Sequence, residues 1–455
     1  MSVDLKHEKR AVASLAFLYM MRMFGLFMVL PVLALYAPGY QGFTPFLMGV
    51  AMGIYGISQG VLQIPMGFLS DRIGRRPVVV SGLLLFAAGS IVAALSTSIY
   101  GLIFGRFLQG CGAVSSALMA LVSDLTSEQN RTRAMATVGA SIGLSFMLAM
   151  IAGPTLSSVF GLSGLFWVTF VLATGGMLVM WKLVPVPVAQ QAGQRVGHGD
   201  TLPSALLLKT VLRDGNLLRL DLGVFMVHAC LMACFTVVPT LLEQQLELPR
   251  KSHWEVYLPI LVGSFIAMLP LMIIGERKRQ IKKVFLLAIG LLVLAFAVLS
   301  AFHQSNSGLL VGLSVFFFAF NLLEAQMPSL VSKLSHAGQR GTAMGVFSAC
   351  QSLGVAAGGF CGGYLRQFNN PGLLFVVLMA MTAVWWMLSL SMSEPRYLTN
   401  LMLPVFGDAD QLCAQLMQIP GVEEAMVVKE EAMAYLKVNE LALDKQALEN
   451  MRAAG

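Results

Sequence analysis

Long apolar stretches separated by short polar ones run through most of this chain. Windows of about 20 apolar residues, the length of a helix that crosses a bilayer, predict about twelve spans. The spans cover residues 11–36, 46–68, 78–96, 101–123, 134–157, 164–184, 217–242, 254–275, 284–302, 308–331, 341–363 and 371–392. The first stretch is too long for a signal-peptide core and has no small-residue cleavage site, so we expect it to be retained. The pattern therefore predicts an all-α membrane protein.

Composition agrees with this class. Of the 455 residues, 57% are hydrophobic and 12% are charged, whereas soluble domains carry about 25% charged residues. The net charge is +7, but the basic residues lie in short loops between apolar stretches, a pattern of membrane orientation rather than nucleic-acid binding. Most of these loops share a side with the N-terminus, so both termini are predicted to be cytoplasmic. The six cysteines are scattered and imply no disulfide framework.

A polar segment divides the apolar part of the chain into two halves. Residues 185–216 are predicted to be a cytoplasmic linker between residues 1–184 and residues 217–395. Segments 121–135 and 330–344 share Leu, Val, Ser, Leu, Arg, Ala and Met at a constant offset, and each closes one span and opens the next. A repeat of six spans in one orientation predicts two six-helix bundles, with a small-molecule substrate bound between them near mid-membrane.

The final segment, residues 396–455, leaves the membrane pattern. It shows a strand near Leu401, a helix over residues 408–418, a hairpin over residues 422–438 and a second helix over residues 443–452. This order predicts a small α+β ferredoxin-like domain in the cytoplasm, although a final strand is not evident. Binding of a cytoplasmic partner is left open as a role of this C-terminal domain.

A charged turn punctuated by glycines joins the second and third spans. Asp71 is placed to accept hydrogen bonds from the N-terminus of the helix that starts near Arg340, and Asp124 to pair with Arg75. Lys333 stands in the place of Asp124 in the second half, so this lock is predicted only in the first half. The alternative is a set of solvated charges that only fix topology. The residues of the predicted lock are Gly67, Asp71, Arg72, Gly74, Arg75 and Asp124.

Four ionisable side chains lie inside apolar stretches, where a charge needs a partner or a water-filled cavity. Glu324 is the first candidate for carrying a proton, and Arg106 and His228 are further candidates for proton coupling. Arg22 and Glu324 are the candidates for the substrate cavity. The alternatives are a snorkelling Arg106, a neutral hydrogen-bonded Glu324 and a packing role for His228. No acid stands at helical spacing beside His228 and its neighbouring cysteines, so no metal site is predicted.

Several motifs together resemble the drug/proton antiporter branch of the major facilitator superfamily, over about residues 10–395. The charged turn matches motif A of that family. The fourth-helix motif B is matched by Arg106, Gln109, Gly110 and Gly112. The first-helix motif is resembled by Gly25 and Pro31, and the fifth-helix motif C is matched by Gly143, Gly153 and Pro154. The closing glycine pair of motif C is replaced here by Ser157 and Ser158, so the packing of this helix is expected to differ.

The resemblance implies a major facilitator fold in the cell inner membrane, with motif C as a helix-packing motif. It also implies proton-coupled export of a small amphipathic or drug-like compound, driven by the proton gradient with no cofactor. An uptake permease and a membrane sensor that signals through the C-terminal domain are the alternatives. An enzyme is not predicted, because no convergent catalytic set is found at one depth. No nucleotide-binding loop of the GxxxxGK[ST] type supports ATP-driven transport.

Overall fold

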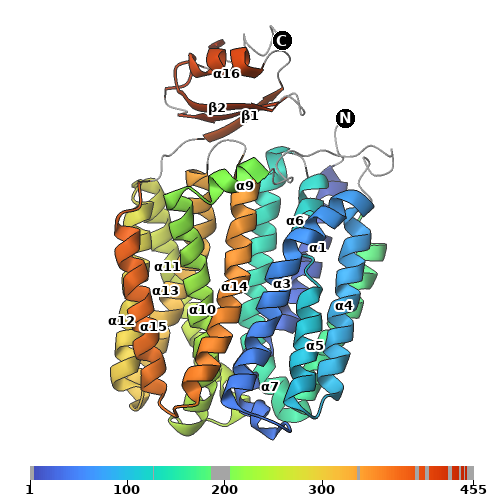
Figure 1. Cartoon of the computed structure of the whole chain (residues 1–455), viewed down its shortest axis with the longest axis vertical. Helices are drawn as coiled ribbons and strands as arrows, with labels where there is room; N and C mark the ends of the chain where they lie inside the picture. The colour runs from blue at the N-terminus through green and yellow to red at the C-terminus, as the bar shows by residue number, and fades with distance from the viewer. Residues whose placement is uncertain are drawn as a thin grey trace.

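The computed structural model describes residues 5–126, 128–185, 205–335, 339–394, 399–404, 409–428, 433–439, 442–444 and 446–447. Figure 1 shows two groups of long helices side by side, with a small layered domain above them and both chain ends on the side of that domain. The predicted linker lies mostly outside the described residues. The whole is an all-helical membrane bundle with an added α+β part.

The first group holds six predicted spans in helices that are often broken. The first and fourth spans each consist of two helices, and one continuous stretch holds the fifth and sixth. Its elements are α1 (Leu5–Phe27), α2 (Leu30–Tyr36), η1 (Ala37–Gly39), α3 (Pro45–Ile73), α4 (Arg75–Leu95), α5 (Ile99–Cys111), α6 (Ser115–Asp124) and α7 (Glu128–Lys182).

The second group follows the same plan with longer unbroken helices. Its elements are α9 (Ala205–Val211), α10 (Gly215–Gln244), η2 (Arg250–Ser252), α11 (Trp254–Arg277), α12 (Ile281–Phe302), α13 (Asn306–Leu334), α14 (Arg340–Arg366) and α15 (Pro371–Leu390). In the described part of the chain, eleven helical stretches are long and apolar enough to cross a membrane. One of them, Arg133–Lys182, is interrupted by the non-helical Gly161 (φ 65°, ψ −173°). The eleven stretches therefore contain the twelve predicted spans.

The two halves meet most closely along α3 and α14. A Cβ atom added to Gly49 would lie 2.2 Å from the Gly359 carbonyl oxygen, and one on Gly56 would lie 2.4 Å from that of Ser352. Only glycine allows helices to approach this closely, as in other membrane helix pairs. Farther along, Gly67 has only Ser116 of its own half as a neighbour, and Gly345 has no atom within 4 Å.

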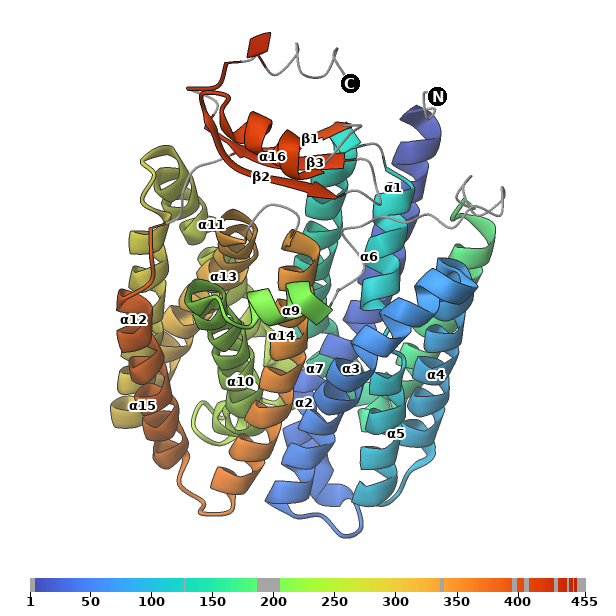
Figure 2. The same cartoon turned by 45° about the horizontal axis from the view of Figure 1, so that its top comes forward.

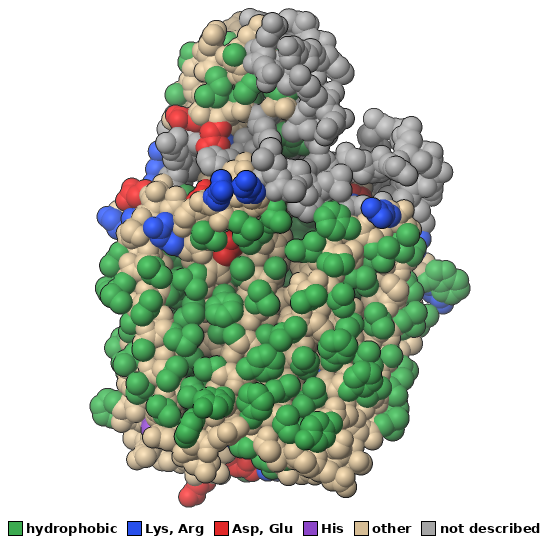
Figure 3. Space-filling view, viewed as in Figure 1, with side chains coloured by type: hydrophobic (Ala, Val, Ile, Leu, Met, Phe, Trp, Pro, Cys, Tyr) green, Lys and Arg blue, Asp and Glu red, His purple; other side chains and the backbone are tan. Residues whose placement is uncertain are grey.

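Figures 1 and 2 agree with these contacts. The two helices cross near the end of the bundle distant from the chain termini and separate toward the other end. The halves are thus joined at one end and diverge at the end where the α+β domain lies. Side chains on the outer wall are largely hydrophobic, as Figure 3 shows for one face.

The C-terminal domain has a three-stranded antiparallel sheet of order β1-β3-β2. Its core includes Leu416, Ala434 and Leu436. The described elements are β1 (Thr399–Pro404), α16 (Ala409–Met417), β2 (Val422–Val428) and β3 (Met433–Val438). The predicted strand, helix and hairpin are therefore present. Most of the predicted second helix lies outside the described residues, and the ferredoxin-like classification stays a prediction.

One described hydrogen bond attaches this domain to the second bundle. Lys437 of β3 is 4% exposed, and its Nζ donates to the Lys333 carbonyl oxygen at the end of α13, at 3.0 Å. A buried lysine needs such a partner, so this contact fixes one face of the sheet against the bundle.

The glycine contact between the halves gives a stability prediction. Gly56→Ala places a methyl group against the Ser352 carbonyl and should cost about 1–3 kcal/mol through overpacking. Gly345→Ala, in open space on α14, is the matched control. Thermal unfolding in detergent should show a clear fall in Tm for the first variant and little change for the second. Equal shifts would contradict the close contact.

Candidate functional site

Three side chains from three different helices of the second half converge at one point. Gln351 of α14 places its Nε2 2.7 Å from His228 Nε2 of α10 and 3.4 Å from Glu324 Oε1 of α13. His228 Nε2 also lies 3.8 Å from Glu324 Oε2. The structure thus brings together two of the predicted proton-coupling residues and adds Gln351, which the sequence reasoning missed.

The hydrogen bonds of His228 define two states of this cluster. Its Nδ1 lies 3.0 Å from the Val224 carbonyl oxygen, which can only accept, so Nδ1 carries a proton. In the neutral ring, Nε2 accepts from the amide of Gln351. In the protonated ring, Nε2 becomes a donor and turns to an oxygen, either the Gln351 amide oxygen after a flip or Glu324. The cluster therefore offers two hydrogen-bonding arrangements that differ by small side-chain movements.

The cluster lies at the junction of the two halves. The Phe320 ring is 6.1 Å from that of His228 and 6.3 Å from that of Phe146 in α7 of the first half. Phe146 in turn meets Phe27 of α1 edge-on at 5.2 Å. The Glu324 side chain is 40% exposed, whereas that of His228 is 10% exposed. A partly exposed Glu324 side chain, whose Oε2 is buried without a hydrogen-bond partner, thus stands beside a buried imidazole at the junction of the bundles.

Arg106 belongs to a different network, inside the first bundle. It is 1% exposed, donates to the Ala51 carbonyl oxygen at 3.3 Å and to Gln109 Oε1 at 2.8 Å. Its guanidinium also lies 5.0 Å from the centre of the Tyr55 ring. No acid within the described residues pairs with it. A snorkelling arginine would extend its guanidinium to water, whereas the guanidinium of Arg106 is buried. Arg106 is therefore a desolvated cation held by neutral groups.

Arg22 spans a break in the fourth predicted span. The guanidinium, 2% exposed, donates to Gly112 O at 3.1 Å and to Ser115 Oγ at 2.8 Å, on either side of the gap between α5 and α6. It also donates to Tyr55 Oη at 3.3 Å. A broken helix in hydrocarbon leaves carbonyl groups without partners, which is costly unless a donor is supplied. These contacts of Arg22 lie within the first bundle, and Glu324 is not among them.

The charged turn forms an ion pair within the first half. Arg75 Nε lies 3.3 Å from Asp124 Oδ2, with side chains 7% and 12% exposed, and Arg75 also donates to Ser70 Oγ at 2.8 Å. Gly74 (φ 101°, ψ 152°) separates α3 from α4 in a conformation that favours glycine. The side chain of Asp71 lies outside the described ones, and Arg72 is exposed.

An ion pair also stands at the corresponding place of the second half, with the charges exchanged. Lys333 donates to both oxygens of Glu276 at 2.7 Å, across the ends of α13 and α11. The expectation that such a pair is confined to the first half is therefore wrong. The repeat placed Lys333 opposite Asp124, but the acid that pairs with it lies in the last turn of α11, outside the aligned segments.

The motif C residues separate into two environments. A Cβ on Gly153 would lie 2.5 Å from the Met28 carbonyl oxygen, so α7 packs closely where α1 gives way to α2, one residue before Pro154. Gly143 has no atom within 4 Å. Ser157 accepts through its carbonyl oxygen from Tyr36 Oη at 2.8 Å. Close packing is thus present at Gly153 and absent at Gly143.

A helical bundle of two repeated halves, with ionisable side chains at their junction, is the architecture of a solute transporter. A family model, the Major Facilitator Superfamily, matches residues 15–359 and 261–400. The chain belongs to this superfamily, and its members are transporters rather than enzymes.

Relatives and solved structures agree with this assignment. The chain is 42% identical over 446 residues to the inner membrane transport protein YajR of Escherichia coli K12, covering 97% of each. It is 27% identical over 376 residues to the multidrug resistance protein MdtH of Aeromonas salmonicida, covering 78% of this chain and 88% of that one. The structure of the nucleoside transporter NupG matches with a TM-score of 0.67 at 15% identity, covering 84% of this chain and 98% of that one. This last likeness concerns the fold.

The role of Arg22 at the helix break is open to a stability test. Arg22→Met removes the donors to Gly112 and Ser115 and should cost about 1–3 kcal/mol for each group left unpaired. Arg133→Met, at an exposed arginine of α7, is the control. Thermal unfolding should show a marked loss for the first variant only. Similar small falls in Tm for both variants would contradict a structural role of Arg22.

Proposed function

We propose that this protein is a secondary active transporter that exports a small amphipathic or drug-like compound in exchange for protons. The observation that carries the proposal is the cluster of His228, Glu324 and Gln351 at the junction of the halves. A partly accessible carboxylate beside a titratable imidazole is suited to exchange protons with either side as the halves move. The relative whose name denotes multidrug resistance supports export.

Orientation follows from the distribution of charge. The basic side chains at the ends of α11, α12 and α13 lie on the side of the chain termini, and a positive excess favours the cytoplasm. We therefore place both termini in the cytoplasm and the protein in the inner membrane. Because α3 and α14 separate toward that side, this arrangement corresponds to a state that faces the cytoplasm.

The proposed cycle uses the joined and the separated ends in turn. Substrate enters between the halves from the cytoplasm while Glu324 is ionised or held by His228. With substrate bound, the halves rock to open on the other side, where Glu324 takes up a proton and substrate leaves. The protonated, empty form then rocks back and releases the proton to the cytoplasm, so protons move inward as substrate moves outward. The ion pairs Arg75–Asp124 and Lys333–Glu276 lie within single halves, so each half moves as a unit. Arg106 and Arg22 then hold the first half rigid.

Two other functions, an uptake permease and a sensor, differ from the proposed exporter in whether solute crosses the membrane and in which direction. An uptake permease would carry solute inward with protons, and the direction of flux separates it from an exporter. A sensor would change partner binding at the C-terminal domain without flux. The contact of Lys437 with Lys333 favours some coupling between that domain and the bundle. We propose that the domain is a ferredoxin-like regulatory module, for which the strand order β1-β3-β2 is the support.

The proton role of Glu324 has a direct test. Glu324→Gln keeps the size and the hydrogen-bonding shape of the side chain but cannot ionise, so proton-driven flux should be lost while binding of transported compounds stays measurable. Proteoliposomes with an imposed pH gradient and a panel of fluorescent amphipathic dyes provide the assay. Glu255→Gln, at an exposed acid of α11, should transport normally. Full pH-dependent flux in Glu324→Gln would place the proton carrier elsewhere.

The C-terminal domain is expected to be dispensable for transport itself. A chain that ends at Glu394 retains both bundles and the cluster, so it should insert, fold and keep basal flux in the same assay. Lys437→Ala in the full chain tests the domain contact alone and should alter regulation without loss of flux. A well-folded truncated protein with no flux, restored by adding the domain back, would make the domain part of the cycle.

A further inference from the structure

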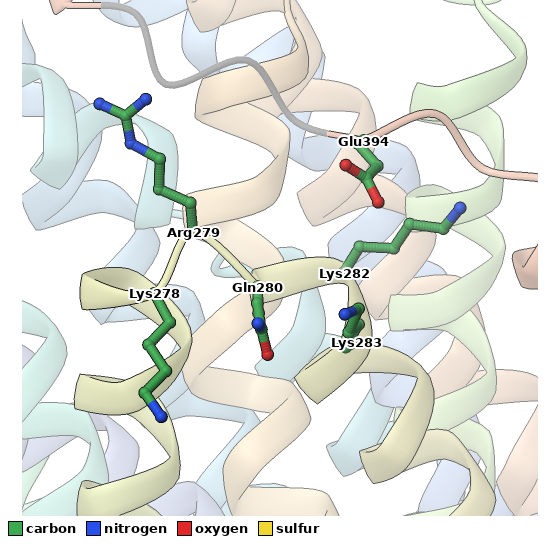
Figure 4. A pocket seen from close by; sticks show the side chains of 6 residues that line it. All are labelled: Lys278, Arg279, Gln280, Lys282, Lys283 and Glu394. Atoms are coloured by element: carbon green, nitrogen blue, oxygen red, sulfur yellow. The ribbon is translucent and has the colours of Figure 1, made fainter.

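A strongly basic pocket lies where α11 gives way to α12, on the side of the chain termini. Figure 4 shows its lining side chains around the turn between the two helices, with one residue from the segment that leads to the C-terminal domain. Its volume is about 230 Å³. The lining residues are Lys278, Arg279, Gln280, Lys282, Lys283 and Glu394.

The lining of this pocket carries an excess of positive charge, with four cationic side chains and one carboxylate, that of Glu394. Figure 4 shows Lys282 and Lys283 on the side of Glu394, while Lys278 and Arg279 point away from it. Within the described residues, Lys278, Lys282 and Lys283 make no ion pair, and neither does Glu394. Like charges held close together repel one another, and this repulsion falls when an anion lies among them. The lining therefore favours a bound anion.

The start of α12 adds to this preference. Its N-cap residue, Gln280, makes no side-chain capping hydrogen bond, and its first turn contains no acid. Lys282 and Lys283 stand in that turn, where the helix dipole disfavours cations and favours an anion. An anionic group in the pocket would neutralise the lysines and be favoured by the dipole of α12.

The apolar surface on the membrane side of the pocket indicates that the anionic group belongs to a lipid. Ile273 and Ile274 in the last turns of α11 are 52% and 44% exposed, and Leu287 in the second turn of α12 is 48% exposed. Figure 3 shows Lys and Arg side chains along the upper rim of a largely hydrophobic wall. Basic groups directly above a lipid-facing apolar surface match a phospholipid, whose phosphate and acyl chains need both.

We propose that this pocket binds the headgroup phosphate of an anionic phospholipid, with the acyl chains lying along α11 and α12. This site is separate from the cluster between the halves, and the inference does not depend on the transport proposal. The segment after Glu394 leads to β1, so lipid at this pocket also lies beside the tether of the C-terminal domain.

Lipid titration of the purified full chain in detergent tests the site. Thermal shifts are measured against phosphatidylglycerol, phosphatidylcholine and inorganic phosphate, giving an apparent Kd for each. Phosphatidylglycerol should raise Tm, while the other two should not. Lys282→Gln/Lys283→Gln should weaken phosphatidylglycerol binding about thirtyfold, from the contribution of two lysines near an anionic lipid.

A matched variant controls for lost charge alone. Lys182→Gln/Lys209→Gln removes two exposed lysines outside the pocket and should bind phosphatidylglycerol as the unmodified protein does. If the pocket variant does not fold, Lys283→Gln alone, at an exposed position, replaces it with a correspondingly smaller loss. Equal affinity in the pocket and control variants would overturn the proposal. A Tm shift with inorganic phosphate equal to that with phosphatidylglycerol would show a site for free anions. An equal Tm shift with phosphatidylcholine would show nonspecific lipid binding. Either result would also overturn the proposal.

Discussion

Everything polar inside the hydrocarbon must find its partner within the protein, and this constraint organises the structure. Arg22 shows the consequence for the backbone, because it supplies donors where the fourth span is broken between α5 and α6. Arg106 shows the consequence for charge, because carbonyl and amide oxygens and the face of Tyr55 take the place of an acid. In the first half, Arg22 and Arg106 have neutral partners and no described acid beside them, whereas the buried Arg75 pairs with Asp124.

The second half meets the same constraint with groups that can change state. His228 has one nitrogen fixed by the Val224 carbonyl and the other facing Gln351 and Glu324. In the proposed cycle, protonation would change contacts only at this cluster, while the first half would move as a rigid unit. The glycines of α3 and α14 form the joined end, where backbone contact at Gly49 and Gly56 leaves few interlocking side chains to separate when this end opens.

The spans could be predicted from the sequence because they are set by hydropathy over long windows. The two-fold plan could be predicted because segments 121–135 and 330–344 share residues, whereas the predicted linker lies mostly outside the described residues. The strand, helix and hairpin of the C-terminal domain also followed from short-range alternation. Gln351 could not be found this way, since a glutamine among small residues carries no signal until α14 is placed beside α10. The pairing of Lys333 with Glu276 was missed for a similar reason, because the acid lies in another segment.

The buried arginines show a different limit of prediction from sequence. Depth in a span correctly marked Arg22 as a residue that needs a partner, but depth does not say whether that partner faces the cavity or the bundle interior. The glycines at 110 and 112 were a signal for the helix break, yet the sequence does not show which donor serves it. Contacts across 90 residues decide such questions.

The central claim is that the two halves rock about the cluster at their junction as Glu324 gains and loses a proton. Spin-label distances in liposomes test it, with one pair at Leu95 and Phe368 near the joined end and another at Trp181 and Arg277 near the chain termini, all exposed. On lowering the pH, the account predicts that the first distance increases while the second decreases, and that Glu324→Gln fixes both at their low-pH values at every pH. Distances that stay constant, or that change in the same direction at both ends, would contradict it.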